Sequence, residues 1–143
     1  MYRNILVPVD LTADASWKAA LPQAVELARF SGGTLHLLAV VPDMGMPLVE
    51  GFFPERYEER ALQSAKGKLD ILARAELPAE IPHEQHVALG RVYDRIIEAA
   101  AAHAADLIVM ASHDPDRTRD FLLGSNADKV VRRSPVSVLV VRA

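Results

Sequence analysis

The alternation of two kinds of segment sets the strongest limit on the fold of this 143-residue chain. Short runs rich in Val, Ile and Leu alternate with longer segments in which apolar residues recur at helical spacing. Strand–helix–strand units of these lengths join parallel strands. We therefore predict an α/β fold: an open, doubly wound sheet of five parallel strands with helices on both faces. The predicted strands are 5–9, 34–41, 83–89, 106–110 and 136–141, and the predicted helices are 15–30, 55–75, 92–105 and 124–133.

Local sequence signals mark several ends of these elements. The glycines of Ser-Gly-Gly at 31–33 allow the first helix to end in the left-handed conformation. Residues 43–54 are rich in proline and glycine and form the longest irregular stretch, which is a candidate functional loop. The run 83–89 alternates polar and apolar residues, which is typical of a strand near a sheet edge. The sequence contains no repeat or linker, so we predict a single domain over residues 1–143.

Composition and charge exclude several classes of protein. The chain has no cysteine, which rules out disulfides, thiolate metal ligands and cysteine nucleophiles. Its net charge of −3 argues against general binding to nucleic acid or to an anionic membrane. The first apolar stretch is interrupted at Pro8 and Asp10, too soon for a signal peptide or a membrane span. We therefore expect a cytoplasmic protein.

A first candidate binding residue follows the first strand. Ligands of open parallel sheets bind beyond the carboxyl ends of the strands. Asp10 lies at such an end, and its carboxylate can accept hydrogen bonds from a ribose or an adenine, or hold a metal ion. The alternative is that Asp10 or Thr12 caps the first helix.

A second candidate is the start of the last helix. Gly124, Ser125 and Asn126 open that helix, and the unpaired N–H groups of a helix N-terminus attract phosphate. Gly124 would let the backbone approach a phosphate closely, and the Ser125 hydroxyl would add a hydrogen bond. The alternative is that Ser125 or Asn126 is an ordinary N-cap.

Four segments, taken together and in order, resemble the universal stress protein family. They are Asn-Ile-Leu-Val-Pro-Val-Asp at 4–10, Asp-Leu-Ile-Val-Met-Ala-Ser-His at 106–113, Leu-Leu-Gly-Ser-Asn-Ala-Asp-Lys-Val-Val-Arg at 122–132, and Pro-Val-Ser-Val-Leu-Val-Val-Arg at 135–142. Ala-Ser-His, the following Pro-Asp and Leu-Leu-Gly-Ser-Asn resemble the F-type branch in particular. The resemblance implies a Rossmann-like fold, similar to the adenine nucleotide alpha hydrolases, with strand order 3-2-1-4-5.

The same resemblance implies a site for ATP. Family members that bind ATP carry Gly-x-x-Gly, nine residues, and then Gly-Ser or Gly-Thr. Ala111 and Asp114 replace the first two glycines here, whereas Gly124 and Ser125 match. The resemblance also implies backbone contacts to adenine at Val40 and Val41 of the second strand. If ATP is hydrolysed, we expect Mg²⁺ to bridge the phosphates and Asp10. The predicted nucleotide-binding residues are Pro8, Val9, Asp10, Val40, Val41, Gly90, Ala111, Ser112, His113, Gly124, Ser125 and Asn126.

The last strand predicts self-association. The run from Val136 to Val141 is apolar on both faces, and a strand of this kind at a sheet edge pairs with another chain. The resemblance implies a homodimer formed through residues 136–141, with tetramers in some relatives. We predict an ATP-binding stress-response protein in which occupancy biases conformation or partner choice. Two alternatives stay open: a nucleotide-free dimeric scaffold, which Ala111 and Asp114 favour, and a slow ATP-hydrolysing enzyme, for which the sequence offers no clear general base.

Two histidines lie in the third predicted strand. His83 and His86 are three residues apart in a predicted strand, so their side chains point to opposite faces. We therefore predict that they do not share a metal ion.

Overall fold

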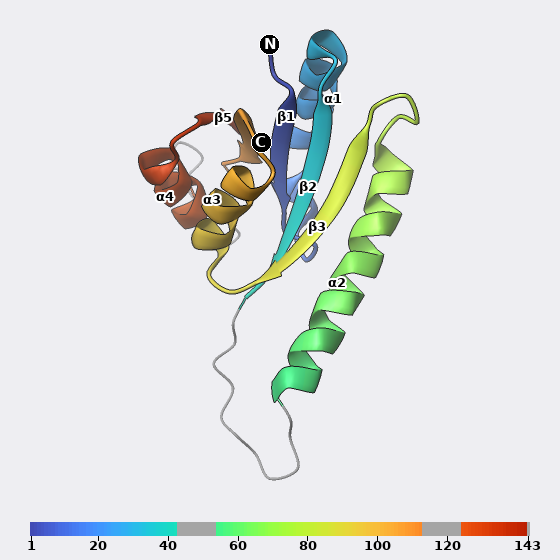
Figure 1. Ribbon diagram of the computed structural model, residues 1–143, viewed down its shortest axis with the longest axis vertical. Coiled ribbons are helices and arrows are strands. Elements are labelled where there is room, and N and C mark those ends of the chain that lie inside the picture. Colours follow the sequence, from blue (N-terminus) through green and yellow to red (C-terminus); the bar gives the residue numbers. More distant parts are fainter. Residues whose placement is uncertain (43–53, 113–123, 143) are drawn as a thin grey trace.

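The strands form the predicted sheet. The computed structural model describes residues 1–42, 54–112 and 124–142. Its five-stranded parallel sheet has the order β3-β2-β1-β4-β5, as the resemblance implied (Figure 1). The strands are β1 (Asn4–Val9), β2 (Thr34–Val41), β3 (His83–Leu89), β4 (Leu107–Ala111) and β5 (Ser137–Val141).

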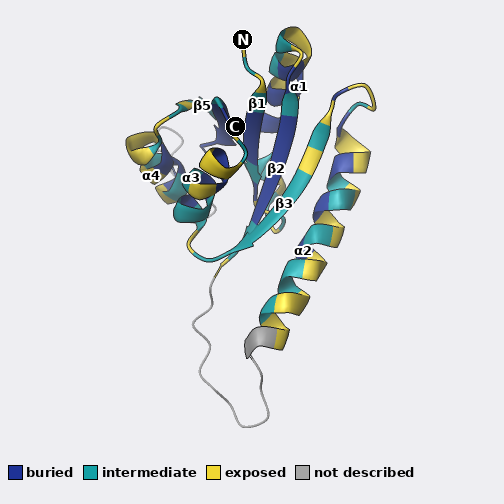
Figure 2. Ribbon diagram, viewed as in Figure 1, coloured by how far each residue is buried: buried dark blue, intermediate teal, exposed yellow. Residues whose placement is uncertain are grey.

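Helices cover both faces of this sheet. They are α1 (Ala20–Ser31), α2 (Pro54–Glu76), α3 (Val92–Ala102) and α4 (Ser125–Arg133). Successive strand side chains point to opposite faces, so Ile5 and Val7 of β1 pack in the core with α1 and α2, whereas Leu6 packs with α3 and α4. Burial of both faces explains why the central strands are continuous apolar runs (Figure 2).

The first helix begins later than predicted. A short 3₁₀ turn spans Asp14–Ser16, and α1 begins only at Ala20. The Ser16 hydroxyl accepts a hydrogen bond from the Asp10 N–H at 2.9 Å and donates one to the Asp10 carbonyl at 3.0 Å. These side-chain bonds hold the segment as a turn, since serine competes with helical backbone bonding. At its other end α1 finishes as predicted, with Gly32 at a φ of 69°.

The third helix ends earlier than predicted, at Ala102. Ala104 then takes a φ of 52° and directs the chain back toward β4. The candidate loop at 43–54 lies outside the described residues except for Pro54, which begins α2.

The two edges of the sheet are β3 and β5, so the prediction of β3 near an edge is confirmed. Within residues 1–42, 54–112 and 124–142, no strand pairs with the outer side of β5. No helix in the described part of the chain is both long enough and apolar enough to cross a membrane.

Candidate functional site

A cavity of about 630 Å³ opens at the carboxyl ends of β1, β2 and β4. Residues of α2 and of the first turns of α3 and α4 also line it. This volume lies in the range of sites that hold small-molecule ligands. The position also agrees with the rule that open α/β sheets bind ligands beyond the carboxyl ends of their strands.

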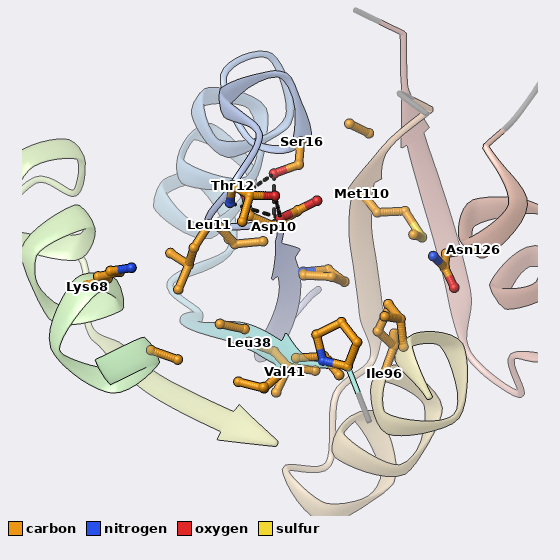
Figure 3. A pocket seen from close by; sticks show the side chains of 18 of the residues that line it. Asp10, Leu11, Thr12, Ser16, Leu38, Val41, Lys68, Ile96, Met110 and Asn126 are labelled. Carbon is orange, nitrogen blue, oxygen red and sulfur yellow. Dashed lines mark hydrogen bonds between the residues drawn. The ribbon is translucent and has the colours of Figure 1, made fainter. Parts of the chain in front are cut away.

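Asp10 is held in a defined orientation at one side of this cavity (Figure 3). Its Oδ1 accepts hydrogen bonds from the Thr12 N–H at 2.9 Å and the Thr12 hydroxyl at 2.6 Å. The 3₁₀ turn and α1 both lack a side-chain cap, so the helix-cap alternative for Asp10 and Thr12 is wrong. Within the described part of the chain Oδ2 has no hydrogen-bond partner, which leaves it available to a ligand hydroxyl or a cation.

The end of β2 forms a mainly apolar wall. Val40 and Val41 line the cavity beside the buried Leu38. Ile96 of α3 and Met110 of β4 also line the cavity (Figure 3), and Val40 packs against the core cluster that contains both. Side chains of this kind suit a flat, weakly polar ring such as a purine base.

The start of α4 supplies main-chain donors. Gly124 is the N-cap, with φ −62° and ψ 156°, and its N–H donates to the Ser112 carbonyl at 3.0 Å. The helical bonding begins with the Asp128 N–H, which donates to the Gly124 carbonyl at 2.9 Å. No side-chain cap bond is present, so the N-cap alternative for Ser125 and Asn126 is wrong. The helix therefore directs its positive dipole end at the cavity, which Gly124, Ser125 and Asn126 line.

Lys68 of α2 is a cavity residue that the sequence predictions missed. It lies opposite Asn126 (Figure 3) and places a cation within reach of an anionic ligand. The helical spacing contains the signal, because three small residues on the same face precede the lysine and leave room beside the sheet. These residues are Ala61, Ser64 and Ala65.

Nine of the twelve predicted binding residues line the cavity: Pro8, Val9, Asp10, Val40, Val41, Ala111, Gly124, Ser125 and Asn126. Ser112 is buried behind it and bonded through its backbone to β5 and Gly124. His113, like Asp114, lies outside the described residues.

The backbone conformation explains why residue 90 is a glycine. It has a φ of 138°, and its N–H donates to the Val41 carbonyl at 2.9 Å. An added Cβ would lie 2.9 Å from the Nε of Arg95. Gly90 is not among the described residues that line the cavity, and its contact with a nucleotide stays a prediction.

Comparison with known proteins agrees with this architecture. The profile of the Universal stress protein family matches residues 1–142. Universal stress protein G of Escherichia coli O157:H7 is 33% identical over 144 residues, covering 99% of this chain and 100% of that protein.

Solved structures show the same likeness. The universal stress protein UspA from Lactobacillus plantarum matches with a TM-score of 0.74 and 27% identity, covering 99% of this chain and 98% of that one. A universal stress protein in complex with cAMP matches with a TM-score of 0.63 and 26% identity, covering 99% and 97%. The chain therefore belongs to the universal stress protein family, as the four segments of its sequence predicted.

Proposed function

We propose that the cavity binds an adenine nucleotide, with ATP as the physiological ligand. The base would lie against the apolar wall at the end of β2, and the ribose would meet Asp10. The observation that carries the proposal is one cavity bounded by that wall, by a carboxylate and by the start of α4. A related structure with bound cAMP supports the choice of an adenine nucleotide.

The phosphates would lie at the N-terminus of α4. The dipole end of the helix favours an anion there, and the Lys68 ammonium group adds positive charge on the opposite side of the cavity. Asp10 is the one carboxylate among the described residues that line the cavity. Mg²⁺ is commonly held by one or two carboxylates together with phosphate oxygens, so this donor set fits a Mg²⁺ ion bound with ATP through Asp10.

Nucleotide binding would act as a switch in a cytoplasmic homodimer formed through β5. Support comes from the position of β5 at a sheet edge and from the partial exposure of Val138, Leu139 and Val140. Pairing of two such edges would satisfy their backbone groups in a two-fold assembly. Occupancy of the cavity would bias the conformation or the partner choice of this dimer.

Titration of ATP, AMP and cAMP into nucleotide-free protein, with and without Mg²⁺, tests the ligand. The variant Gly124→Val places a branched side chain at the phosphate end and should weaken ATP binding about 10–100-fold. Gly67→Ala is the matched control, since an added Cβ at Gly67 meets no atom within 4 Å. Circular dichroism shows whether each variant is folded, and Gly124→Ala serves as the milder change. Unchanged ATP affinity in a folded Gly124→Val variant would contradict the proposed phosphate position.

The nucleotide-free scaffold predicts a different result. Ala111 lines the cavity where ATP-binding relatives carry glycine, so its Cβ takes up space there. The scaffold alternative requires that mass spectrometry of the denatured, purified protein finds no nucleotide and that none of the three ligands binds in the titration. Either a copurified adenine nucleotide or saturable binding rules it out.

Sedimentation velocity tests the dimer. Val140→Glu should weaken self-association, because a charge at the paired edge would be desolvated. Val131→Glu on the exposed face of α4 is the control and should leave self-association unchanged. If Val140→Glu and Val131→Glu both sediment as dimers, an interface through β5 is excluded. The same measurement with and without ATP tests the switch.

A further inference from the structure

Three histidines meet on the α3 face of the sheet, between its middle and its amino end. His36 is near the start of β2, His86 is in β3, and His103 follows the last turn of α3. One ring nitrogen from each histidine lies within 4.8 Å of those of the other two. In the described part of the chain, these three side chains lie close enough together to hold a metal ion.

The sheet register creates the cluster. Leu38 is paired with His86, and residues two apart on a strand share a face, so His36 and His86 both point toward α3. His83 lies on the opposite face of β3, as predicted, and takes no part. After α3, the left-handed turn at Ala104 leaves His103 above the two strand histidines. The ring centroids of His86 and His103 are 3.7 Å apart.

Asn4 fixes the tautomer of His36. The Asn4 amide donates to the Ala104 carbonyl over 3.5 Å, which turns its Oδ1 toward His36. Oδ1 lies 2.9 Å from His36 Nε2, so Nε2 carries the proton and donates it. The lone pair of His36 Nδ1 then points at His86 Nε2, 3.0 Å away. An oxygen acceptor behind a histidine is the usual arrangement of the outer shell of a metal site.

His36 is buried, His86 is half-buried, and a carboxylate lies beside both rings. Burial is the main cause that lowers the pKa of His36 and of His86; the neighbouring His103 also lowers both pKa values, whereas the Glu84 carboxylate raises them. Glu84 Oε2 is 3.4 Å from His36 Nδ1 and 3.7 Å from His86 Nε2. The carboxylate therefore lies beside both nitrogens, where it provides a further oxygen ligand for a metal ion.

We propose that His36, His86 and His103 bind a divalent transition-metal ion of the Zn²⁺ type, with Glu84 or a water molecule as the fourth ligand. Imidazole nitrogen suits Zn²⁺, Cu²⁺ and Ni²⁺, whereas Mg²⁺ and Ca²⁺ require oxygen ligands. None of the three histidines is among the described residues that line the nucleotide cavity. Leu38, which does line it, is paired with His86 and lies two residues from His36, so the two sites share a sheet face but no residue.

Binding requires a small, local rearrangement. Tetrahedral Zn²⁺ with Zn–N bonds of about 2.0–2.1 Å separates its nitrogen ligands by roughly 3.3 Å. The His36–His86 pair at 3.0 Å is already close to this separation. His86 must move its ring proton from Nε2 to Nδ1, and His103 must rotate out of its stack. His103 is only half-buried and lies just beyond the last turn of α3, so its ring has room to turn.

Untagged protein treated with a chelator and then dialysed provides the test. Titration with Zn²⁺ by calorimetry should show one bound ion per chain, and Co²⁺ should give the visible absorption of a tetrahedral nitrogen site. His103→Asn removes a proposed ligand and should weaken Zn²⁺ binding about 100-fold or more. Asn4→Ala changes only the outer shell and should weaken it roughly 10–100-fold. His83→Asn is the matched control in the same strand and should bind Zn²⁺ like the unchanged protein.

Three outcomes would overturn the proposal. They are the absence of saturable Zn²⁺ binding, equal affinities in folded His103→Asn and unchanged protein, and loss of binding in His83→Asn. His103 is half-buried and outside the strands, so its variant should fold, and circular dichroism verifies this. His86→Asn is a second variant that should reproduce the loss. Mg²⁺ should produce no heat and no change at this site.

Discussion

The two ends of the sheet offer different chemistry to a ligand. At the carboxyl end the cavity presents the start of α4, one carboxylate and apolar strand residues. At the amino end three imidazoles come together, two of them on strands, with His36 only 5% exposed. The first site combines main-chain donors with side chains, whereas the second consists of side chains alone.

This contrast follows from the direction of parallel strands. Every helix on the sheet begins near the carboxyl end and finishes near the amino end, so free N–H groups gather at one end and helix C-termini at the other. Anions therefore suit the carboxyl end, and a cation suits the amino end. The proposed nucleotide and the proposed metal ion agree with this polarity.

The largest expected effect comes from filling both sites at once. A ligand at about 100 times its Kd stabilises the folded state by about 2.7 kcal/mol, so AMP and Zn²⁺ together should add about 5 kcal/mol. Two sites that share no residue should act nearly additively. Chemical denaturation with each ligand alone and with both measures the effect. AMP is chosen over ATP because a triphosphate chelates divalent metal ions. If the stabilisation with both ligands is well below the sum of the two single stabilisations, the two sites are coupled or share a ligand.

The Asp10 carboxylate should contribute next. Asp10→Asn keeps an oxygen that can accept the Thr12 bonds but removes the charge, so ATP affinity should fall about 10–100-fold because a charged hydrogen bond is lost. Calorimetry measures the change, with Asp14→Asn as the control on the nearby exposed turn. Zn²⁺ affinity should stay constant in both variants. A parallel loss in Asp14→Asn would assign the effect to general charge instead.

Gly90 should matter for stability and not for affinity. Gly90→Ala forces a side chain onto a φ of 138°, which should lower the free energy of unfolding by about 1–2 kcal/mol. Urea denaturation measures this loss. The ATP dissociation constant should be unchanged when the variant is folded. A marked loss of affinity at unchanged stability would instead support Gly90 as a nucleotide contact.

Lys68 should give the smallest effect. Its side chain is exposed, so Lys68→Gln should weaken ATP binding only about 2–5-fold, and AMP binding less. Titrations at two salt concentrations should show a weaker salt dependence for the variant. Lys18→Gln, which lies away from the cavity, is the control. Equal losses for AMP and ATP would place Lys68 away from the outer phosphates.

The pattern of the sequence was sufficient to predict most of the helices and strands. Periods of two and of about 3.6 residues, together with proline and glycine, predicted the ranges of β2 and β3 without error, because local backbone preference and burial act together there. Asp10 and Gly124 were found as candidates because each directly adjoins an element end. The start of α1 was missed because the Ser16 bonds to Asp10 override the helical pattern.

Only the folded chain brings distant residues together. Lys68 enters the cavity through the packing of α2 on the sheet, which helical spacing alone does not place. His36, His86 and His103 are 50 and 17 residues apart, and each is unremarkable in its own segment. Their meeting requires the β2–β3 register and the left-handed turn at Ala104. Short-range patterns thus determine which elements form, whereas strand pairing and helix packing determine which side chains share a site.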